Sequence, residues 1–117
     1  MDVDGIREAC MALAGTVEDL KWGNDICFCI GEKMYAVTSE GANGCSGVSL
    51  KVPDAFFTTM TERDGIIPAP YLARYQWVHI APETELEHGE LESLLAMSYE
   101  LILGKMSKKK QRELTGG

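Results

Sequence analysis

Short segments in which apolar and polar side chains alternate constrain the fold more than any other feature of this sequence. Residues 48–52 (VSLKV) and 76–81 (QWVHIA) both alternate in this way, which is typical of strands with one buried and one open face. The valines, the leucine and the isoleucine form the natural core side of these segments. The intervening side chains, Lys51 in the first segment and Trp77 and His79 in the second, are therefore predicted to lie on the opposite face.

A β-hairpin is predicted for residues 25–38 (DICFCIGEKMYAVT), which are rich in β-branched and aromatic residues. The central pair Gly31-Glu32 suits a two-residue turn with glycine at its first position. Both faces of the hairpin are largely apolar, which indicates a place in the middle of a sheet. The expected cross-strand pairs are Cys29 with Met34, Phe28 with Tyr35, Cys27 with Ala36 and Ile26 with Val37.

Helices are predicted on either side of these strands. Apolar residues recur at helical spacing over about 3–14 and again over about 88–103. Pro53 can start a further helix that ends near Gly65, and Ser107 can cap a short basic helix near the C-terminus. Helices and strands within a chain of 117 residues predict one α+β domain.

Two other regions complete this organisation. Residues 66–75 contain two prolines and are predicted to form a loop or a short turn of helix. The end of the domain, at about 105–117, is predicted to be a short basic helix or tail, because five of the eleven basic residues lie there. A solvated helix end is the usual role of such a tail, although it can also contact phosphate.

The charge balance and the cysteines limit the cell compartment and the partners. A formal charge of −7 repels polyanions on average and counts against nucleic acid without excluding it. No apolar stretch is long enough to span a bilayer, and the chain opens with acidic residues, so we expect a cytoplasmic protein. We expect reduced thiols at Cys10, Cys27, Cys29 and Cys45.

No catalytic constellation is visible. The two histidines, His79 and His88, have no nucleophile motif beside them, and neither a G-x-S-x-G sequence nor a glycine-rich phosphate loop is present. We therefore expect a protein that is not an enzyme and needs no cofactor. Active sites assembled in space can escape such motif searches.

Metal binding is considered and not expected. Cys27 and Cys29 point the same way from a strand, and His79 can lie nearby, but free cysteines are more often buried core residues than zinc ligands. Asp4 and Glu8 can form an acidic ridge on the first helix, although acids at this spacing are common on solvated helices.

Lys51, Trp77 and His79 form the leading candidate surface. An exposed indole beside cations can stack on a base while lysine and arginine neutralise phosphate, as in many single-stranded nucleic-acid sites. The competing interpretation is that Trp77 is buried under the 66–75 loop, with the Lys51 stem lying across it.

Several segments taken together resemble the MmcQ/YjbR family. They are, in order, WGNDICFCIGEKMYA, VSLKVP, GIIPAPYLARYQWV and ELESLLAMSYELILGKMSKKKQREL, which cover nearly the whole chain. The most specific parts are Lys33 to Ala36, the Leu50-Lys51 pair, the proline-rich run that leads to Trp77-Val78, and Ser98-Tyr99. Where relatives often have Pro-Phe-Gly, this chain has Lys21-Trp22-Gly23.

The resemblance implies a fold like that of the frataxin homologue CyaY, a twisted antiparallel sheet with helices on one face. Members of the family are often labelled DNA-binding. Carried over by position, the resemblance points to Lys33, Lys51, Arg74 and Trp77, on the open sheet face. The same fold implies a frataxin-like iron-binding alternative on acidic edges, and a module for a small molecule or a protein partner is a third.

Overall fold

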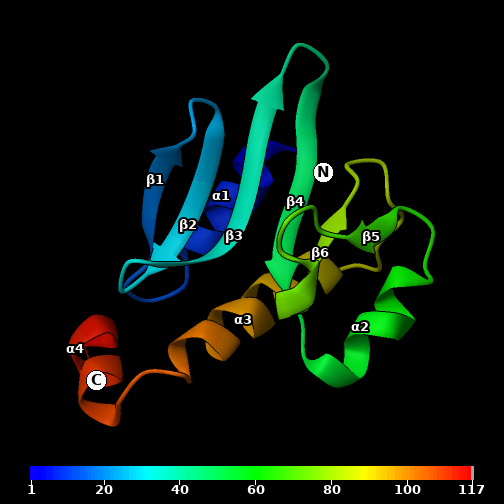
Figure 1. The fold of residues 1–117 in the computed structure, drawn as a ribbon. Coiled ribbons are helices and arrows are strands. Elements are labelled where there is room, and N and C mark those ends of the chain that lie inside the picture. The colour runs from blue at the N-terminus through cyan, green and yellow to red at the C-terminus, as the bar shows by residue number, and fades with distance from the viewer. Residues whose placement is uncertain (117) are drawn as a thin grey trace.

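One antiparallel sheet with helices on a single face forms the framework of the molecule (Figure 1). The structure, a computed structural model, describes residues 1–116. The strand order is β1-β2-β3-β4-β6-β5. In chain order the elements are α1 (Val3–Met11), β1 (Val17–Lys21), β2 (Asp25–Ile30), β3 (Lys33–Gly41), β4 (Gly44–Lys51), α2 (Asp54–Thr61), β5 (Ile66–Pro68), the 3-10 turn η1 (Ala73–Tyr75), β6 (Trp77–Ile80), α3 (Glu90–Leu103) and α4 (Lys108–Thr115). The predicted α+β architecture is confirmed.

The hydrophobic core lies between the sheet and the helices, on what we call the covered face. Phe28, Ala36, Leu50 and Val78 are cross-strand partners that form one row across four strands, and none of them is exposed. Side chains of α1, α2 and α3 pack onto these rows, so the core is continuous. The alternation that predicted β4 and β6 is thus the alternation between covered and open faces.

The predicted hairpin forms, but most of its pairing is shifted by one residue. Gly31 and Glu32 make the two-residue turn with φ of 58° and 69°, and Cys29 lies opposite Met34 as expected. Beyond that point a β-bulge gives β3 one extra residue. The predicted pairs Phe28–Tyr35, Cys27–Ala36 and Ile26–Val37 were therefore wrong, and the structure pairs Phe28 with Ala36, Cys27 with Val37 and Ile26 with Thr38.

The bulge allows Tyr35 to reach the core together with Ala36. Tyr35 is fully buried, and its hydroxyl donates to the carbonyl of Cys10 over 3.2 Å and lies 2.9 Å from the hydroxyl of Thr16. These bonds satisfy a phenol that would otherwise be costly to bury. The alternation of apolar and polar residues in the sequence could not indicate these hydrogen bonds or the bulge that allows them.

Three strand segments were not predicted. The edge strand β1 is exposed along nearly its whole length and so shows no alternation. The short strand β5 lies in the segment that was predicted as a loop, and it ends at Pro68 on the sheet edge, where proline is tolerated. The β3–β4 hairpin extends to Gly41 and Gly44, well beyond the predicted ends of both strands.

Helix α3 crosses the sheet and joins its central strands through a buried hydroxyl. The Ser98 hydroxyl accepts a bond from the backbone N–H of Lys51 over 3.0 Å and donates to the carbonyl of Tyr35 over 2.6 Å. Beside it, the Tyr99 ring meets the Tyr35 ring edge to face at 5.4 Å. The helix therefore fixes the end of β4 that carries Lys51.

The basic C-terminal segment folds as α4 and packs against the domain. Ser107 caps it by accepting a bond from the backbone N–H of Lys110, as predicted. The Leu114 backbone and side chain lie so close to Gly15 and Gly31 that neither position has room for a Cβ atom. None of the helices within residues 1–116 combines the length and the apolar character needed to cross a membrane.

Candidate ligand site on the open sheet face

Two neighbouring hollows open beside β3 and β4: one lies on the face of the sheet opposite the helices, and the other lies at the end of the sheet where α3 ends. Between them the loop that follows β5 folds back over the end of β6: the Ala69 N–H donates to the Trp77 carbonyl, and the Trp77 N–H donates to the Leu72 carbonyl. This loop forms a wall on the otherwise open face. The two hollows lie on either side of that wall and of Met34.

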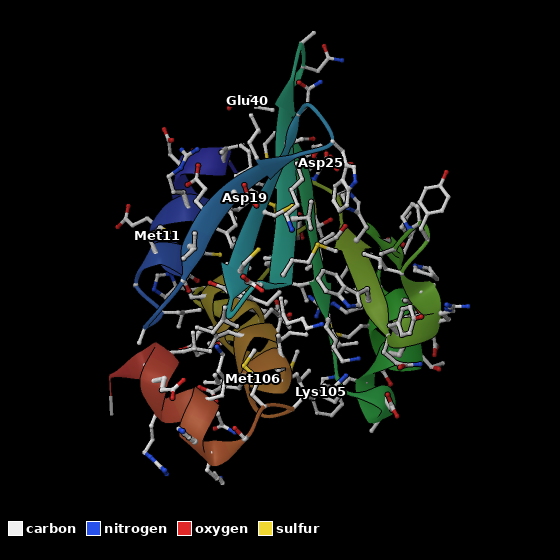
Figure 2. The ribbon with its side chains drawn as sticks, turned by 60° about the vertical axis from the view of Figure 1, so that its left-hand side comes forward. Met11, Asp19, Asp25, Glu40, Lys105 and Met106 are labelled. Carbon is white, nitrogen blue, oxygen red and sulfur yellow. The ribbon has the colours of Figure 1, made fainter. Side chains whose placement is uncertain are left out.

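The first hollow, which we call the lysine pocket, has a volume of about 520 Å³. Three lysines line it from different elements: Lys33 from the start of β3, Lys51 from the end of β4, and Lys105 from the segment after α3. Figure 2 shows Lys105 and its neighbour Met106 in this last segment. No aspartate or glutamate lines the described part of this pocket, and none lies within ion-pair distance of the three ammonium groups among residues 1–116. The lining is Lys33, Met34, Lys51, Leu72, Tyr75, Trp77, Ile102, Lys105 and Met106.

Lys51 is the most constrained of the three lysines. Only 8% of the residue is exposed, its ammonium donates to the carbonyl of Tyr75, and its backbone is held by Ser98. Burial lowers the pKa of Lys51, the charge of Lys105 lowers it further, and Asp54 acts in the opposite direction. An anion in the pocket would favour the charged form of Lys51 and so oppose both effects.

Trp77 lies next to Lys51 but is not available for stacking. The two residues are direct cross-strand partners, so the prediction that they are neighbours on one face is confirmed. The prediction of an exposed indole was wrong, because Trp77 is only 5% exposed. The loop after β5 covers it, as in the competing interpretation, and Trp77 serves as the apolar wall of the lysine pocket.

The remaining two predicted residues lie outside the pocket. Arg74 is exposed on η1, where its guanidinium lies 4.8 Å from the centre of the Tyr75 ring. His79 lies further along β6, and both its ring nitrogens are engaged at 2.9 Å, with Ser49 and with the Ser46 carbonyl. A carbonyl only accepts, so the ring donates from Nε2 and accepts the Ser49 hydroxyl at Nδ1. His79 thus ties β4 to β6.

Residues 1–116 contain no cluster of three His, Cys, Asp or Glu side chains that could hold an ion. Cys27 and His79 lie on strands separated by three strand spacings, roughly 14 Å, so these two side chains are not neighbours. Asp4 forms an ion pair with Arg7 at 3.0 Å.

The cysteines are free thiols, as predicted, and the buried ones are poor nucleophiles. Burial raises the pKa of Cys10 to about 12 and that of Cys27 to about 11. Both are therefore protonated at neutral pH, whereas metal binding and nucleophilic attack need the thiolate.

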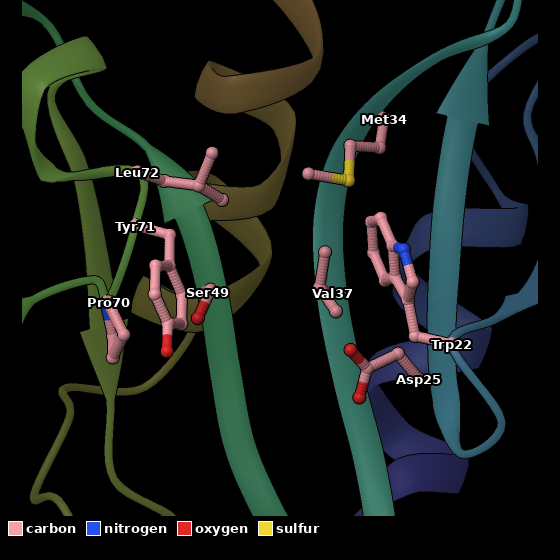
Figure 3. A pocket seen from close by; sticks show the side chains of 8 residues that line it. All are labelled: Trp22, Asp25, Met34, Val37, Ser49, Pro70, Tyr71 and Leu72. Carbon is pink, nitrogen blue, oxygen red and sulfur yellow. The ribbon is translucent and has the colours of Figure 1, made fainter.

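The second hollow, the aromatic cleft, has a volume of about 490 Å³ and lies between two exposed rings. Trp22 in the β1–β2 turn and Tyr71 in the loop after β5 stand on opposite sides, with Val37 and Ser49 on the floor between them (Figure 3). Trp22 is 72% exposed and Tyr71 is 99% exposed. The Asp25 carboxylate is the one acidic group in the described lining.

Both rings are carried by backbone in the left-handed region. Trp22 has φ of 50° and Tyr71 has φ of 67°. Bulky residues rarely adopt this conformation, which costs about 1–3 kcal/mol per residue. Two aromatic rings are thus held in water beside a cleft by a backbone conformation that lowers the stability of the fold. Such strain is typical of a functional site.

Sequence reasoning found one half of this surface. Lys33, Lys51 and Trp77 were predicted and do line a common pocket. Lys105 was assigned to the solvated basic tail, because its approach to the sheet depends on how α3 crosses it. Trp22 and Tyr71 belong to loops, where no periodicity indicates direction.

Comparison with known proteins gives the same architecture. The profile of the YjbR family matches residues 11–101. A crystal structure of a protein from Pseudomonas syringae, determined by structural genomics, superposes with a TM-score of 0.72 at 19% identity, over 86% of this chain and 98% of that one. No curated protein matches the chain. The profile match covers most of the sequence, and the chain belongs to the YjbR family.

Proposed function

We propose that this chain is a non-catalytic protein that binds single-stranded nucleic acid on the open face of its sheet, with phosphate groups held in the lysine pocket. The observation that carries the proposal is the convergence of Lys33, Lys51 and Lys105 on a lining without a carboxylate, in a protein with a net charge of −7. Acidic residues outnumber basic ones by 18 to 11, so a carboxylate-free group of three lysines is a local reversal of the average field.

The pocket has the features that phosphate binding needs. Lysine ammonium groups act as point charges for phosphate oxygens, and Lys51 is already held in place by the Tyr75 carbonyl. Less side-chain entropy is then lost when the anion binds. Arg74, exposed next to Tyr75, can contact a neighbouring phosphate of a longer strand.

A single strand suits this surface better than a duplex. A duplex carries one negative charge per about 1.7 Å of its axis, so the acidic remainder of the protein would repel it strongly. A single strand has a lower charge density and presents unpaired bases, for which the exposed rings of Trp22 and Tyr71 provide stacking partners.

The test compares two double variants that remove the same charge from different places. Affinity for a labelled single-stranded oligonucleotide is measured by fluorescence anisotropy at several salt concentrations. Lys33→Ala with Lys105→Ala should weaken binding and lower the slope of log K against log salt by about 1.4, since each lysine contributes about 0.7 on a single strand. The control, Lys108→Ala with Lys109→Ala on α4, should leave both values almost unchanged.

Equal weakening by both double variants would assign binding to general basic charge and contradict the lysine pocket. No binding by the unmodified protein at low salt would remove the proposed function altogether. Preference for duplex over single strand would contradict the choice of ligand.

A further inference from the structure

The lysine pocket and the aromatic cleft are parts of one surface. Met34 and Leu72 line both, so the two hollows meet at these side chains. One half presents ammonium groups and the other presents aromatic rings over an apolar floor. The ligand that complements both halves carries a planar group next to an anionic group, and this combination describes a nucleotide.

The positions of the rings suit a base that enters the cleft. Trp22 and Tyr71 come from loops at opposite sides of the sheet, and Figure 3 shows them across the cleft from each other. Both are largely exposed in the free protein, so no side chain has to leave before a base can stack. Val37 at the floor gives the base an apolar support.

Asp25 is the residue in the cleft that can distinguish one base from another. Its carboxylate lines the cleft, and within residues 1–116 it makes no hydrogen bond and no ion pair. Its cross-strand partner Lys21 lies 3.9 Å from Asp19 instead. A carboxylate only accepts hydrogen bonds, and its two oxygens match two parallel donors. Asp25 therefore favours a base edge with two adjacent N–H groups.

Guanine is the common base that presents such an edge, with N1–H beside the N2 amino group. Adenine and cytosine each place a ring acceptor next to their amino group, and uracil and thymine place carbonyls on both sides of N3–H. Those acceptors would face the carboxylate and be repelled. A base in the cleft would thus be selected by hydrogen bonding as well as by stacking.

We infer that the aromatic cleft takes a guanine base, which stacks between Trp22 and Tyr71 and donates to Asp25, while its phosphate lies in the lysine pocket. This inference rests on the proposed function and adds the identity of the base. The shared chemistry is that of a guanine nucleotide, either free or as one unit of a single strand.

The test is a calorimetric titration with GMP, IMP, AMP and UMP, supported by tryptophan fluorescence. IMP differs from GMP only in the N2 amino group. We expect GMP to bind about tenfold more tightly than IMP or AMP, the range of one good bidentate base contact. GMP should also quench the exposed Trp22, and that quenching should be absent in Trp22→Ala, in which the buried Trp77 still reports folding.

Three variants separate the contributions. Asp25→Asn should bring the ratio of GMP to AMP affinity close to one, and Tyr71→Ala should weaken binding of every nucleotide by about tenfold. Phe56→Ala, which removes another exposed ring, on α2 and outside both hollows, should have no effect.

Oligothymidylates with and without one central guanosine show whether the site also binds guanine within a single strand. A preference confined to these strands assigns the site to nucleic acid, and tight GMP binding assigns it to the free nucleotide as well.

Equal affinity for all four nucleotides and for both strands, unchanged by Asp25→Asn and Trp22→Ala, would overturn the guanine site. If the Lys33 and Lys105 double variant still weakened oligonucleotide binding in that case, the proposed function would stand without it. If the protein bound none of the nucleotides and oligonucleotides, both the guanine site and the proposed function would be contradicted.

Discussion

Cationic side chains on the covered face of the sheet and cationic side chains around the lysine pocket have opposite surroundings. On the covered side Arg63, after α2, binds Glu90 of α3 through two bonds of 2.6 and 3.1 Å, and Arg7 of α1 binds Glu18 at 2.7 Å. Around the lysine pocket, at the end of the sheet, the three lysines have no such partner among residues 1–116. Paired cations hold elements of the fold together, whereas unpaired ones are left for an external anion.

The pKa values of Arg63 and Lys51 shift in opposite directions because only Arg63 has a carboxylate partner. The hydrogen bonds that Arg63 donates to Glu90 raise the pKa of Arg63, while burial and the neighbouring Lys105 lower the pKa of Lys51. The charge of Arg63 therefore stabilises the folded state, and the charge of Lys51 destabilises it. A charged residue that destabilises the fold is a candidate for a role in ligand binding, because it has no role in stabilising the structure.

The largest expected effect comes from the serine that connects the two sides. Ser98→Ala leaves the Lys51 N–H and the Tyr35 carbonyl without partners in a buried place, so we expect a loss of about 2–4 kcal/mol in the free energy of unfolding. The matched substitution on the open side, Ser49→Ala, should cost less than about 1 kcal/mol, because water can reach His79 in its place.

Urea denaturation of the two serine variants measures this difference directly. Because Ser98 also fixes the backbone at Lys51, its variant should bind oligonucleotide more weakly even where it is fully folded. Similar costs for both serines would contradict the distinction between a satisfied, buried side and a hydrated, open side.

The covered side was the more predictable of the two for a physical reason. Burial imposes periodicity, so Val48, Leu50, Val78 and Ile80 revealed β4, β6 and their inward direction from sequence alone. The bulge at Tyr35 escaped prediction, because its gain comes from hydrogen bonds to residues distant in sequence.

The open side could be predicted only in part. Lys51 and Trp77 were expected to be neighbours from strand alternation, and the register confirms this. Whether Trp77 is exposed depends on the path of the loop after β5, which no local pattern specifies. The same holds for Tyr71, whose full exposure results from that path.

A smaller effect is expected from the paired cation on the covered side. The bonds from Arg63 lower the pKa of Glu90 from its usual 4.5, so the ion pair stabilises the fold above that pH. This contribution is lost as the pH falls through the lower, folded-state pKa. Glu90→Gln should therefore cost about 0.5–1 kcal/mol at pH 7 and progressively less in acid.

Thermal or urea unfolding between pH 7 and pH 3 tests the sign of this dependence. Glu92→Gln removes the same charge from the same turn of α3, where no ion pair is present among the described residues, and serves as the control. A cost of Glu90→Gln that grew on acidification would contradict the assigned pairing.

The smallest expected effect on stability is that of replacing Lys51, the cation without a carboxylate partner. Lys51→Met keeps the apolar stem and removes a buried charge that has no carboxylate partner in the described lining, so the free energy of unfolding should stay constant or rise by up to about 1 kcal/mol. Because the folded-state pKa of Lys51 is lowered, its charge destabilises the fold below that pKa, and the destabilisation disappears as the pH rises through it. Any gain should therefore be largest near neutral pH and vanish in strong alkali, while oligonucleotide affinity falls at neutral pH. A loss of more than about 1 kcal/mol would instead make Lys51 a structural residue, held by the Tyr75 carbonyl for the sake of the fold.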